Sequence, residues 1–325
     1  MDVFRIGFLL GAIIIVPVVL VAYISATEAG LKRLPRTRQP LLRPWFWIGP
    51  AVFLAGVFLV FPSIVTLVLS FFDRSGTTPV GLVNYTDILA DSGFHITLRN
   101  NALWLVLFTG MVLVFGLLIA VLADRVPYEG PAKSLIFMPM AISLVAAALI
   151  WSFMYDYQTP PLPQTGTLNA VVVNGLHRNP VPWIIDPTTN NFALIVVAIW
   201  GWTGFAMIFL SAALKGIPGE LLEAARVDGA NELVVFFRVI LPILMPTVVV
   251  VGTTLVIIAL KAFDVVYVMT AGNYGTNILA LNMYQELFNA RDSGRASAIA
   301  IVLLVAVIPV LYFNIRRIRF QEAIR

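Results

Sequence analysis

The segment KGIPGELLEAARVDGANELVVFFRVILP, residues 215–242, separates two long apolar stretches and has the features of a short helix with its own beginning and end. Pro218 stands where the first turn of a helix tolerates proline, because the nitrogen there needs no hydrogen-bond donor. Gly229 suits the left-handed backbone conformation that commonly ends a helix. The segment therefore predicts a short helix, at about 218–230, between two apolar helices.

The face of this short helix predicts contact with a partner. Leu221, Ala224 and Ala225 fall on one side at i, i+3 and i+4 spacing, and the alanines leave that side shallow. A helix of two or three turns is marginal in water by itself. One alternative is a helix resting on the membrane surface, but bulky aromatics and basic residues come only later, at 236–238. Docking against another protein is the favoured interpretation.

Composition places the whole chain in a membrane. Of its 325 residues 60% are hydrophobic and 12% charged, against about 45–50% and about 25% in soluble domains, and the mean hydropathy is +0.93. A net charge of +4 is too small for a nucleic-acid-binding field. With no cysteine and two histidines, disulfides, thiolate nucleophiles and the usual metal clusters are excluded or disfavoured. The chain is predicted to be a polytopic, all-α membrane protein.

Seven stretches are long and apolar enough to cross a bilayer: 3–24, 45–72, 101–123, 134–155, 192–214, 243–263 and 296–315. The first lacks the basic start of a signal peptide and is retained as a helix. The linker 25–44 is basic and contains three prolines. We therefore expect an accessory helix and linker at 1–44 and a six-helix core at 45–325.

Lysine and arginine predict the orientation, because cytoplasmic loops are enriched in them. One set of alternate loops holds fourteen of the 21 basic residues, and the opposite set holds six. The fourteen are Lys32, Arg33, Arg36, Arg38, Arg43, Arg125, Lys133, Lys215, Arg226, Arg238, Arg316, Arg317, Arg319 and Arg325. The side that holds them, with the C-terminus, is predicted to be cytoplasmic.

The longest connection, 156–191, is on the predicted outer side and contains six prolines, which disfavour helix. Its length suggests a surface for a partner, and an ordinary solvated loop is an equal alternative.

Three parts of the opening segment carry a resemblance to a known family. Glu223-Ala224-Ala225, Asp228-Gly229-Ala230 and Leu241-Pro242 match the cytoplasmic-loop signature of binding-protein-dependent ABC importer permeases, with Val239 where isoleucine is usual. Further matching stretches are GLVNY at 81–85, LIFMP at 135–139 and FDVVYVMT at 263–270. Over about 45–320 the chain resembles the carbohydrate subgroup, in particular maltose and α-glucoside permeases. The stretch 289–319, with GRASA at 294–298, favours the α-glucoside side.

The resemblance implies a six-helix type I ABC importer permease core plus the N-terminal accessory helix. It also implies that residues 218–230 are a coupling helix seated in a cleft of a separate ATP-binding subunit. Glu223, Ala224, Ala225, Asp228, Gly229 and Ala230 would form the docked helix, and Leu241 and Pro242 would fix its return to the membrane.

The implied assembly lies in a prokaryotic cytoplasmic (inner) membrane. Its other components are a second, different permease, two ATP-binding subunits that carry ATP and magnesium, and an extracytoplasmic sugar-binding protein. The chain has no G-x-x-x-x-G-K-[ST] phosphate loop. It is therefore expected to have no catalytic residues, metal or cofactor of its own.

The expected sugar pathway lies in the fifth span, where aromatic faces and a hydroxyl occur together: Trp200, Trp202, Thr203 and Phe205. In maltose-type permeases this span and the next contact substrate. Here the next span has Leu255, Ile258 and Ala259 where polar contacts are expected, so the partner permease is expected to hold most of the site. Packing or a subunit interface is the alternative role of Trp200 and Trp202.

The sequence disfavours two other classes of protein. A secondary transporter or channel often has internal repeats and buried carboxylates, and no clear repeat occurs here. The acid that comes nearest to a buried carboxylate is Asp264, at the outer end of the sixth span. It stands three residues after Lys261, and an ion pair between the two at the membrane interface is the favoured interpretation. A membrane enzyme is disfavoured because G-x-S-x-G and H-E-x-x-H motifs are absent.

Overall fold

In a computed structural model the chain is almost entirely helical. The structure describes residues 3–33, 35, 39–124 and 126–322, so Arg36, Arg38, Arg125 and Arg325 of the orientation count lie outside it. Within the described residues the only β pairing is an isolated bridge between Phe72 and Pro79. Two compact units, Met1–Val65 and Thr66–Arg325, are described separately. The functional division predicted after residue 44 stays a prediction.

The first unit is a pair of helices, α1 (Val3–Lys32) and α2 (Gln39–Ala55), followed by a π-helical turn, η1 (Gly56–Val60). The predicted first span, 3–24, falls within α1. Arg43 of α2 forms an ion pair with Glu28 of α1 at 2.7 Å, and Thr27 and Leu31 are buried. The two helices are therefore joined near the basic linker.

Four helical stretches among the described residues are long and apolar enough to span a membrane: Gln39–Leu69, Ser92–Ala123, Asn190–Lys215 and Glu232–Met269. A bent pair of helices, Glu129–Ala141 and Leu144–Met154, adds a fifth if both halves belong to one span. The described apolar part of α16 (Ser293–Glu322) is the shorter Ser293–Pro309. The first stretch contains α2, η1 and α3 (Phe61–Leu69). The second contains α5 (Ser92–Leu103), the π-helical η2 (Trp104–Phe108) and α6 (Thr109–Ala123).

The prediction of one continuous span at 134–155 is wrong. α7 (Glu129–Phe137) and the 3-10 turn η3 (Met138–Ala141) meet α8 (Leu144–Met154) at an angle of 98°. Pro139 cannot donate a backbone hydrogen bond, and Ser143 is extended and caps α8 by accepting a hydrogen bond from the Ala146 nitrogen at 3.2 Å. The apolar composition predicted a span but did not reveal this break.

The sixth span begins earlier than predicted. α12 (Glu232–Val235), the π-helical η5 (Phe236–Ile240) and α13 (Leu241–Leu260) form one helical stretch, which starts eleven residues before the expected position 243. Asn231 caps its first turn by accepting from the Val234 nitrogen at 2.9 Å. After Lys261 the chain turns into α14 (Asp264–Met269).

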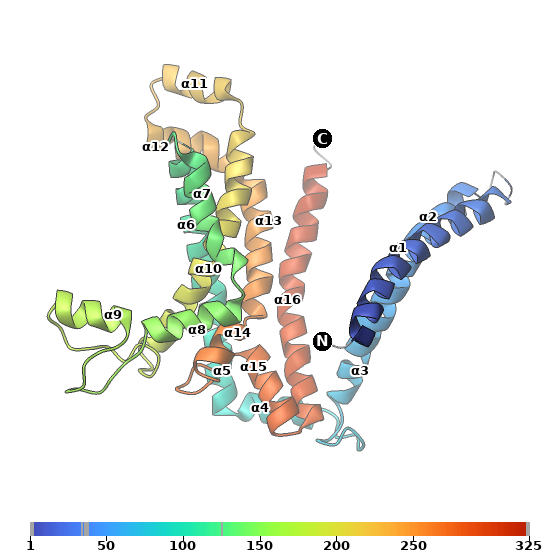
Figure 1. Ribbon diagram of the computed structural model, residues 1–325, viewed down its shortest axis with the longest axis horizontal. Helices are drawn as coiled ribbons and strands as arrows, with labels where there is room; N and C mark the ends of the chain where they lie inside the picture. The colour runs from blue at the N-terminus through green and yellow to red at the C-terminus, as the bar shows by residue number, and fades with distance from the viewer. Residues whose placement is uncertain (1–2, 34, 36–38, 125, 323–325) are drawn as a thin grey trace. The chain divides into compact units, whose positions relative to one another are not determined.

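The core of the second unit surrounds α10 (Asn190–Lys215), whose residues Leu194, Val197 and Leu210 are fully buried. α6 lies very close to it: a Cβ added at Gly116 would lie 2.6 Å from the Cβ of Ala206. In Figure 1, α6, α7, α10 and α13 lie side by side, with α11 beyond one end of them. This compact bundle supports the short helix quoted from the sequence.

The proline-rich connection is a folded segment containing α9 (Thr167–Ala170) and the π-helical η4 (Val171–Gly175). Buried Asn169 organises it by donating to the carbonyls of Asp156 and Val181 at 3.0 Å and accepting from Trp183 Nε1 at 3.2 Å. The connection is therefore an ordered surface, and its contact with a partner stays a prediction.

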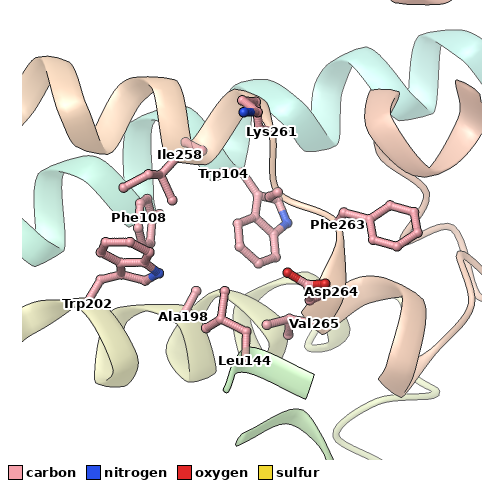
Figure 2. Close-up of a pocket in the computed structure, with 12 residues that line it drawn as sticks. Trp104, Phe108, Leu144, Ala198, Trp202, Ile258, Lys261, Phe263, Asp264 and Val265 are labelled. Carbon is pink, nitrogen blue, oxygen red and sulfur yellow. The ribbon is translucent and has the colours of Figure 1, made fainter. Parts of the chain in front are cut away.

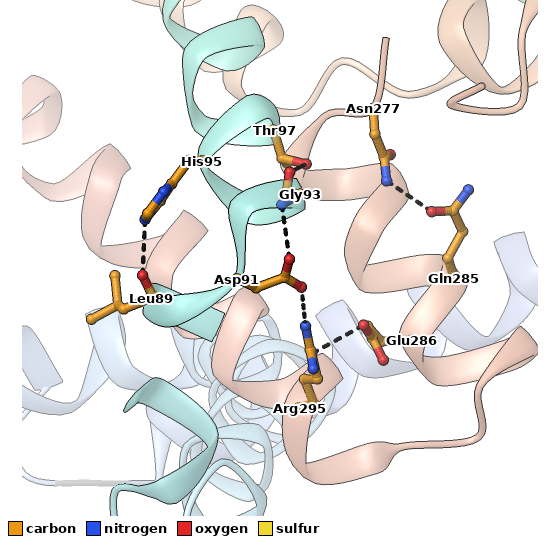
Figure 3. Close-up of polar contacts among 9 residues, drawn as sticks. All are labelled: Leu89, Asp91, Gly93, His95, Thr97, Asn277, Gln285, Glu286 and Arg295. Atoms are coloured by element: carbon orange, nitrogen blue, oxygen red, sulfur yellow. Dashed lines mark hydrogen bonds and ion pairs between the residues drawn. The ribbon is translucent and has the colours of Figure 1, made fainter. Parts of the chain in front are cut away.

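Polar contacts join the helices at the end opposite α11, where α4 (Val83–Ala90), α5, α15 (Leu279–Tyr284) and the π-helical η6 (Gln285–Asn289) meet α16 (Figure 3). Arg295 of α16 lies 2.5 Å from Asp91 Oδ2 and 3.1 Å from Glu286 Oε1. Burial raises the pKa of the Glu286 carboxyl, and the charge of Arg295 opposes that rise. The ion pair between Arg295 and Asp91 therefore joins α16 to the beginning of α5, two elements that are far apart in the sequence.

Candidate functional site: a surface helix and an apolar pocket

The short helix predicted from residues 215–242 is α11 (Gly219–Val227), held away from the bundle by two short connections (Figure 1). Glu223, Ala224 and Asp228 are exposed, and Val227 has 87% of its surface exposed. Ala225 packs instead against the unit's own core. Leu221 and Ala224 are exposed and Ala225 is partly buried, and the docking face predicted from these three residues stays a prediction.

Gly229 ends α11 in the conformation that its sequence position predicted. Its φ is +84°, its nitrogen donates to the Arg226 carbonyl at 3.0 Å, and the Ala230 nitrogen donates to the Ala225 carbonyl at 3.1 Å. This pair of bonds is the Schellman motif, which satisfies the last carbonyls of a helix and needs a left-handed residue. The φ predicted for Gly229 is confirmed.

A small apolar cluster holds α11 in place. Its buried members are Ile217, Val235, Ile240 and Leu244, and Ala225 and Ala230 pack against it. Arg226 also pairs with Glu232 of α12 at 2.9 Å, although both side chains are about half exposed, so the pair contributes about 0–1 kcal/mol. The loop is therefore shaped before any partner binds.

Leu241 and Pro242 lie inside the helix that follows α11, not in a loop. The Leu241 nitrogen donates to the Phe236 carbonyl, the i to i−5 pattern of a π-helical turn. Pro242 stands at the beginning of α13, where its missing N–H falls next to that irregular turn. The segment predicted to lead the chain back to the membrane is therefore a π-helical turn within a continuous helix.

A second feature is an apolar pocket between η2, α8, α10, α13 and α14 (Figure 2). Its volume is about 60 Å³, room for a few water molecules and far below the about 300–1,000 Å³ of typical small-molecule sites. The lining residues include Trp104, Phe108, Leu144, Ala198, Trp202, Ile258, Ala259 and Asp264. This pocket by itself is too small to hold a sugar.

Two polar groups in this pocket have no partner among the described residues. Trp104 is 2% exposed, and its Nε1 donates no hydrogen bond to any of them. The carboxylate of Asp264 points into the pocket in Figure 2, and no described group forms a hydrogen bond or ion pair with it. Lys261 and Asp264 form no ion pair in the structure, so the expected interfacial pair is wrong. The pocket thus offers the Trp104 N–H as a donor and the Asp264 carboxylate as an acceptor, and Trp202 and Lys261 also bring N–H groups to its lining.

The four predicted pathway residues do not form one site. Trp202 lines the pocket. The ring of Phe205 packs edge-to-face with the ring of Trp202, with 5.7 Å between the ring centroids. Trp200 and Thr203 lie on another side of α10, along an apolar groove of about 630 Å³. Trp200 packs edge-on against Trp151 there, and Thr203 Oγ1 donates to the Ile199 carbonyl at 2.7 Å. Of the four, Trp202 alone lines this pocket, and the role of all four in a sugar pathway stays a prediction.

Sequence reasoning missed Trp104 and Val227. Trp104 follows Ala102 and Leu103 at the start of an apolar stretch, and its spacing to Phe108 is typical of core packing. Val227 was not assigned to the docking face because it lies beyond the alanine pair. In both cases only the folded arrangement shows which way the side chain faces.

This all-helical bundle with its projecting α11 has the architecture of a membrane permease. The chain belongs to the family described as "binding-protein-dependent transport system inner membrane component", whose model matches residues 112–321. It is 48% identical to the osmoprotective compounds uptake permease protein GgtC of Synechocystis sp., over 86% of this chain and 100% of that protein. It is 45% identical to the alpha-glucoside transport system permease protein AglF of Rhizobium meliloti, over 85% and 82%.

Solved structures with the same fold include two of a bacterial alginate ABC transporter. One is in complex with an alginate-bound periplasmic protein; its TM-score is 0.72 at 21% identity, covering 86% of this chain and 96% of that chain. The other has a TM-score of 0.70 at 22% identity, covering 87% and 99%. The predicted all-α ABC permease fold is confirmed, and the chain is a binding-protein-dependent transporter component of the inner membrane.

Proposed function

We propose that this chain is one of two different transmembrane subunits of an ATP-driven importer of α-glucosides or related oligosaccharides. The single observation that carries the proposal is α11, a preformed helix with exposed small residues in a family of binding-protein-dependent permeases. The 45% identity to an alpha-glucoside permease supports the substrate class.

In this proposal α11 is the coupling helix. Glu223, Ala224 and Asp228 contact a separate ATP-binding subunit, with Gly229 and Ala230 closing the helix behind them. ATP and magnesium bind to two such subunits, and this chain hydrolyses nothing. An extracytoplasmic binding protein delivers the sugar to the opposite end.

The α11 end of the bundle faces the cytoplasm in this proposal. Lys215, Arg226 and Arg238 surround α11, which agrees with the enrichment of basic residues in cytoplasmic loops. α16 runs from the opposite end toward the α11 end, so the C-terminus is proposed to be cytoplasmic in a prokaryotic inner membrane (Figure 1).

The sugar passes along the face of this chain that bears Trp202, Phe205 and the small pocket. Aromatic faces stack on sugar rings, while Trp104 Nε1 and the Asp264 carboxylate are free to bond with hydroxyls. Because the pocket is too small for a sugar, the second permease supplies the rest of the site, and Trp202 moves when the pathway opens.

Reconstitution tests the proposal. The chain, its second permease, the ATP-binding subunit and the binding protein are placed in proteoliposomes, and uptake of labelled maltose and trehalose is measured beside a labelled amino acid. Sugar uptake that needs both ATP and the binding protein is expected. Uptake driven by an ion gradient without ATP indicates a secondary transporter instead, and selective amino-acid uptake refutes the substrate class.

A further inference from the structure

A cluster of charged side chains ties α7 to the last turn of α10. Glu129, the first residue of α7, accepts from Lys215 Nζ at 2.6 Å and from Lys133 Nζ. Lys133 also donates to the hydroxyl of Ser211, which is 4% exposed on α10. The side chains of Glu129 and Lys133 are partly buried, at 26% and 15% exposed. The first turn of α7 is therefore joined to α10 by charge-assisted bonds, which are the stronger kind.

The other end of α7 packs directly on the backbone of α10. A Cβ added at Gly204 would lie 2.7 Å from Phe137 Cα and 2.8 Å from the Ile136 carbonyl oxygen, so only glycine permits this approach. α7 is thus held to α10 at both ends, by side-chain charges near Lys215 and by backbone contact near Gly204.

This cluster stands immediately before the coupling helix. Lys215 is the last residue of α10, and Gly216, Ile217 and Pro218 alone separate it from α11. Ile217 is buried, so the connection is held to the bundle and does not swing freely. A displacement of α11 therefore acts first on Lys215 and its partner Glu129.

The far end of the bent span reaches the pocket. η3 follows α7, and Leu144, the first residue of α8, lines the same pocket as Trp202 (Figure 2). Leu144 also approaches α10, since its Cδ2 lies 3.7 Å from a Cβ built at Gly201. A shift of α7 along α10 would therefore move a wall of the pocket.

We propose that Glu129 is a positioning residue that makes α7 and α10 move as one body when α11 is displaced. Movement at the ATP-binding subunit then changes the pocket wall at Leu144. Without the Glu129–Lys215 tie, α10 can follow α11 while the first turn of α7 lags behind. This inference rests on the proposed role of α11 in the previous section.

The test measures coupling in the complete reconstituted transporter. Glu129→Gln keeps the size of the side chain and removes its charge. We expect the number of sugars imported per ATP hydrolysed to fall by about 2- to 30-fold, the range that single substitutions in coupled elements produce. Assembly with the ATP-binding subunit and the melting temperature stay near wild type. An unchanged sugar-to-ATP ratio overturns the proposal.

A double-mutant cycle separates the ion pair from a local effect on α7. Lys215→Gln alone is expected to lower the ratio about as much as Glu129→Gln, and the two substitutions together are expected to lower it little further, because each removes the same pair; fully additive losses overturn the proposal. Glu28→Gln is the matched control, because it breaks a comparable 2.7 Å ion pair in the first unit. That variant is expected to keep the wild-type ratio.

Cross-linking tests the one-body movement directly and does not depend on how well the charge variants fold. The chain contains no cysteine, so Glu129→Cys with Lys215→Cys introduces a unique pair that a short bis-methanethiosulfonate can bridge. The unbridged double variant is expected to import fewer sugars per ATP hydrolysed than wild type, and bridging is expected to raise that number again. Loss of transport on bridging, reversed by reductant, overturns the proposal because it shows that the two positions must separate.

Failure of the proposed function gives a different result. If α11 does not dock on an ATP-binding subunit, wild-type chain fails to bind that subunit, and no variant changes ATP hydrolysis. If only the Glu129 inference is wrong, binding and stimulated hydrolysis are normal and the ratio is unaffected by Glu129→Gln.

Discussion

Replacing Gly229 tests the closure of α11 most directly. Its φ of +84° lies in the left-handed region, where other L-residues lose about 1–2 kcal/mol. A Cβ built at Gly229 meets nothing within 4 Å, so the cost comes from the backbone conformation and not from a clash. Gly229→Val is therefore expected to disfavour the closed loop by about 1–2 kcal/mol, or more because valine is β-branched.

The expected consequence is weaker docking. A penalty of about 1–2 kcal/mol lowers the population of the binding-competent loop by about 5- to 30-fold, and the apparent Kd for the ATP-binding subunit rises by the same factor. Membrane insertion and the melting temperature of the transmembrane bundle stay unchanged, because α11 lies outside it. Uptake falls while the ATP-binding subunit keeps its own basal hydrolysis.

Binding of the purified ATP-binding subunit to detergent-solubilised permease, followed by fluorescence, measures this Kd. Gly229→Asn should lose less than Gly229→Val, because asparagine tolerates the left-handed region better. Gly219→Ala is the control, since Gly219 has no neighbour within 4 Å of a Cβ and no positive φ. Equal affinity for wild type and Gly229→Val, with wild-type uptake, refutes the reasoning.

Three other predictions concern the bundle. Trp104→Phe removes a buried donor without a partner, so the melting temperature should hold or rise while uptake slows by about 2- to 10-fold; unchanged uptake contradicts a sugar contact. Gly204→Ala brings a Cβ to 2.7 Å from Phe137 Cα and should cost about 1–3 kcal/mol in thermal unfolding, whereas Gly110→Ala, with open space around it, should not. Burial raises the pKa of Glu286, so the stability of wild type relative to Glu286→Gln should be greatest at acid pH and decline as the pH rises through that raised pKa; a parallel pH dependence of both melting temperatures rejects this.

Much of the helical content followed from local pattern. The stretch from Gly219 to Gly229 contains its own start, its own stop and a composition unlike the spans around it, so a short helix was predictable there. The break at Ser143 was not, because Leu, Ala and Met continue on both sides and periodicity cannot separate one straight span from two bent halves.

The candidate site was less predictable than the helices. Trp200, Trp202 and Thr203 are neighbours in sequence, yet helical rotation and the packing of α7 and α8 send them to two different sides of α10. Likewise Lys261 and Asp264 have helical spacing, but the helix ends at Leu260, so their side chains do not meet. Tertiary packing decided each case.

By itself, the sequence determined that this is a polytopic permease with a short helix between two spans. Apolar length, charge asymmetry and the Gly229 stop act locally, and they do not depend on the rest of the chain. Tertiary structure alone decided that Val227 is exposed, that Trp104 Nε1 faces a pocket without a partner, and that Glu129 meets Lys215 across 86 positions. Those features arise where separate helices pack against one another, and the packing of side chains between helices has no signature in the spacing along either one.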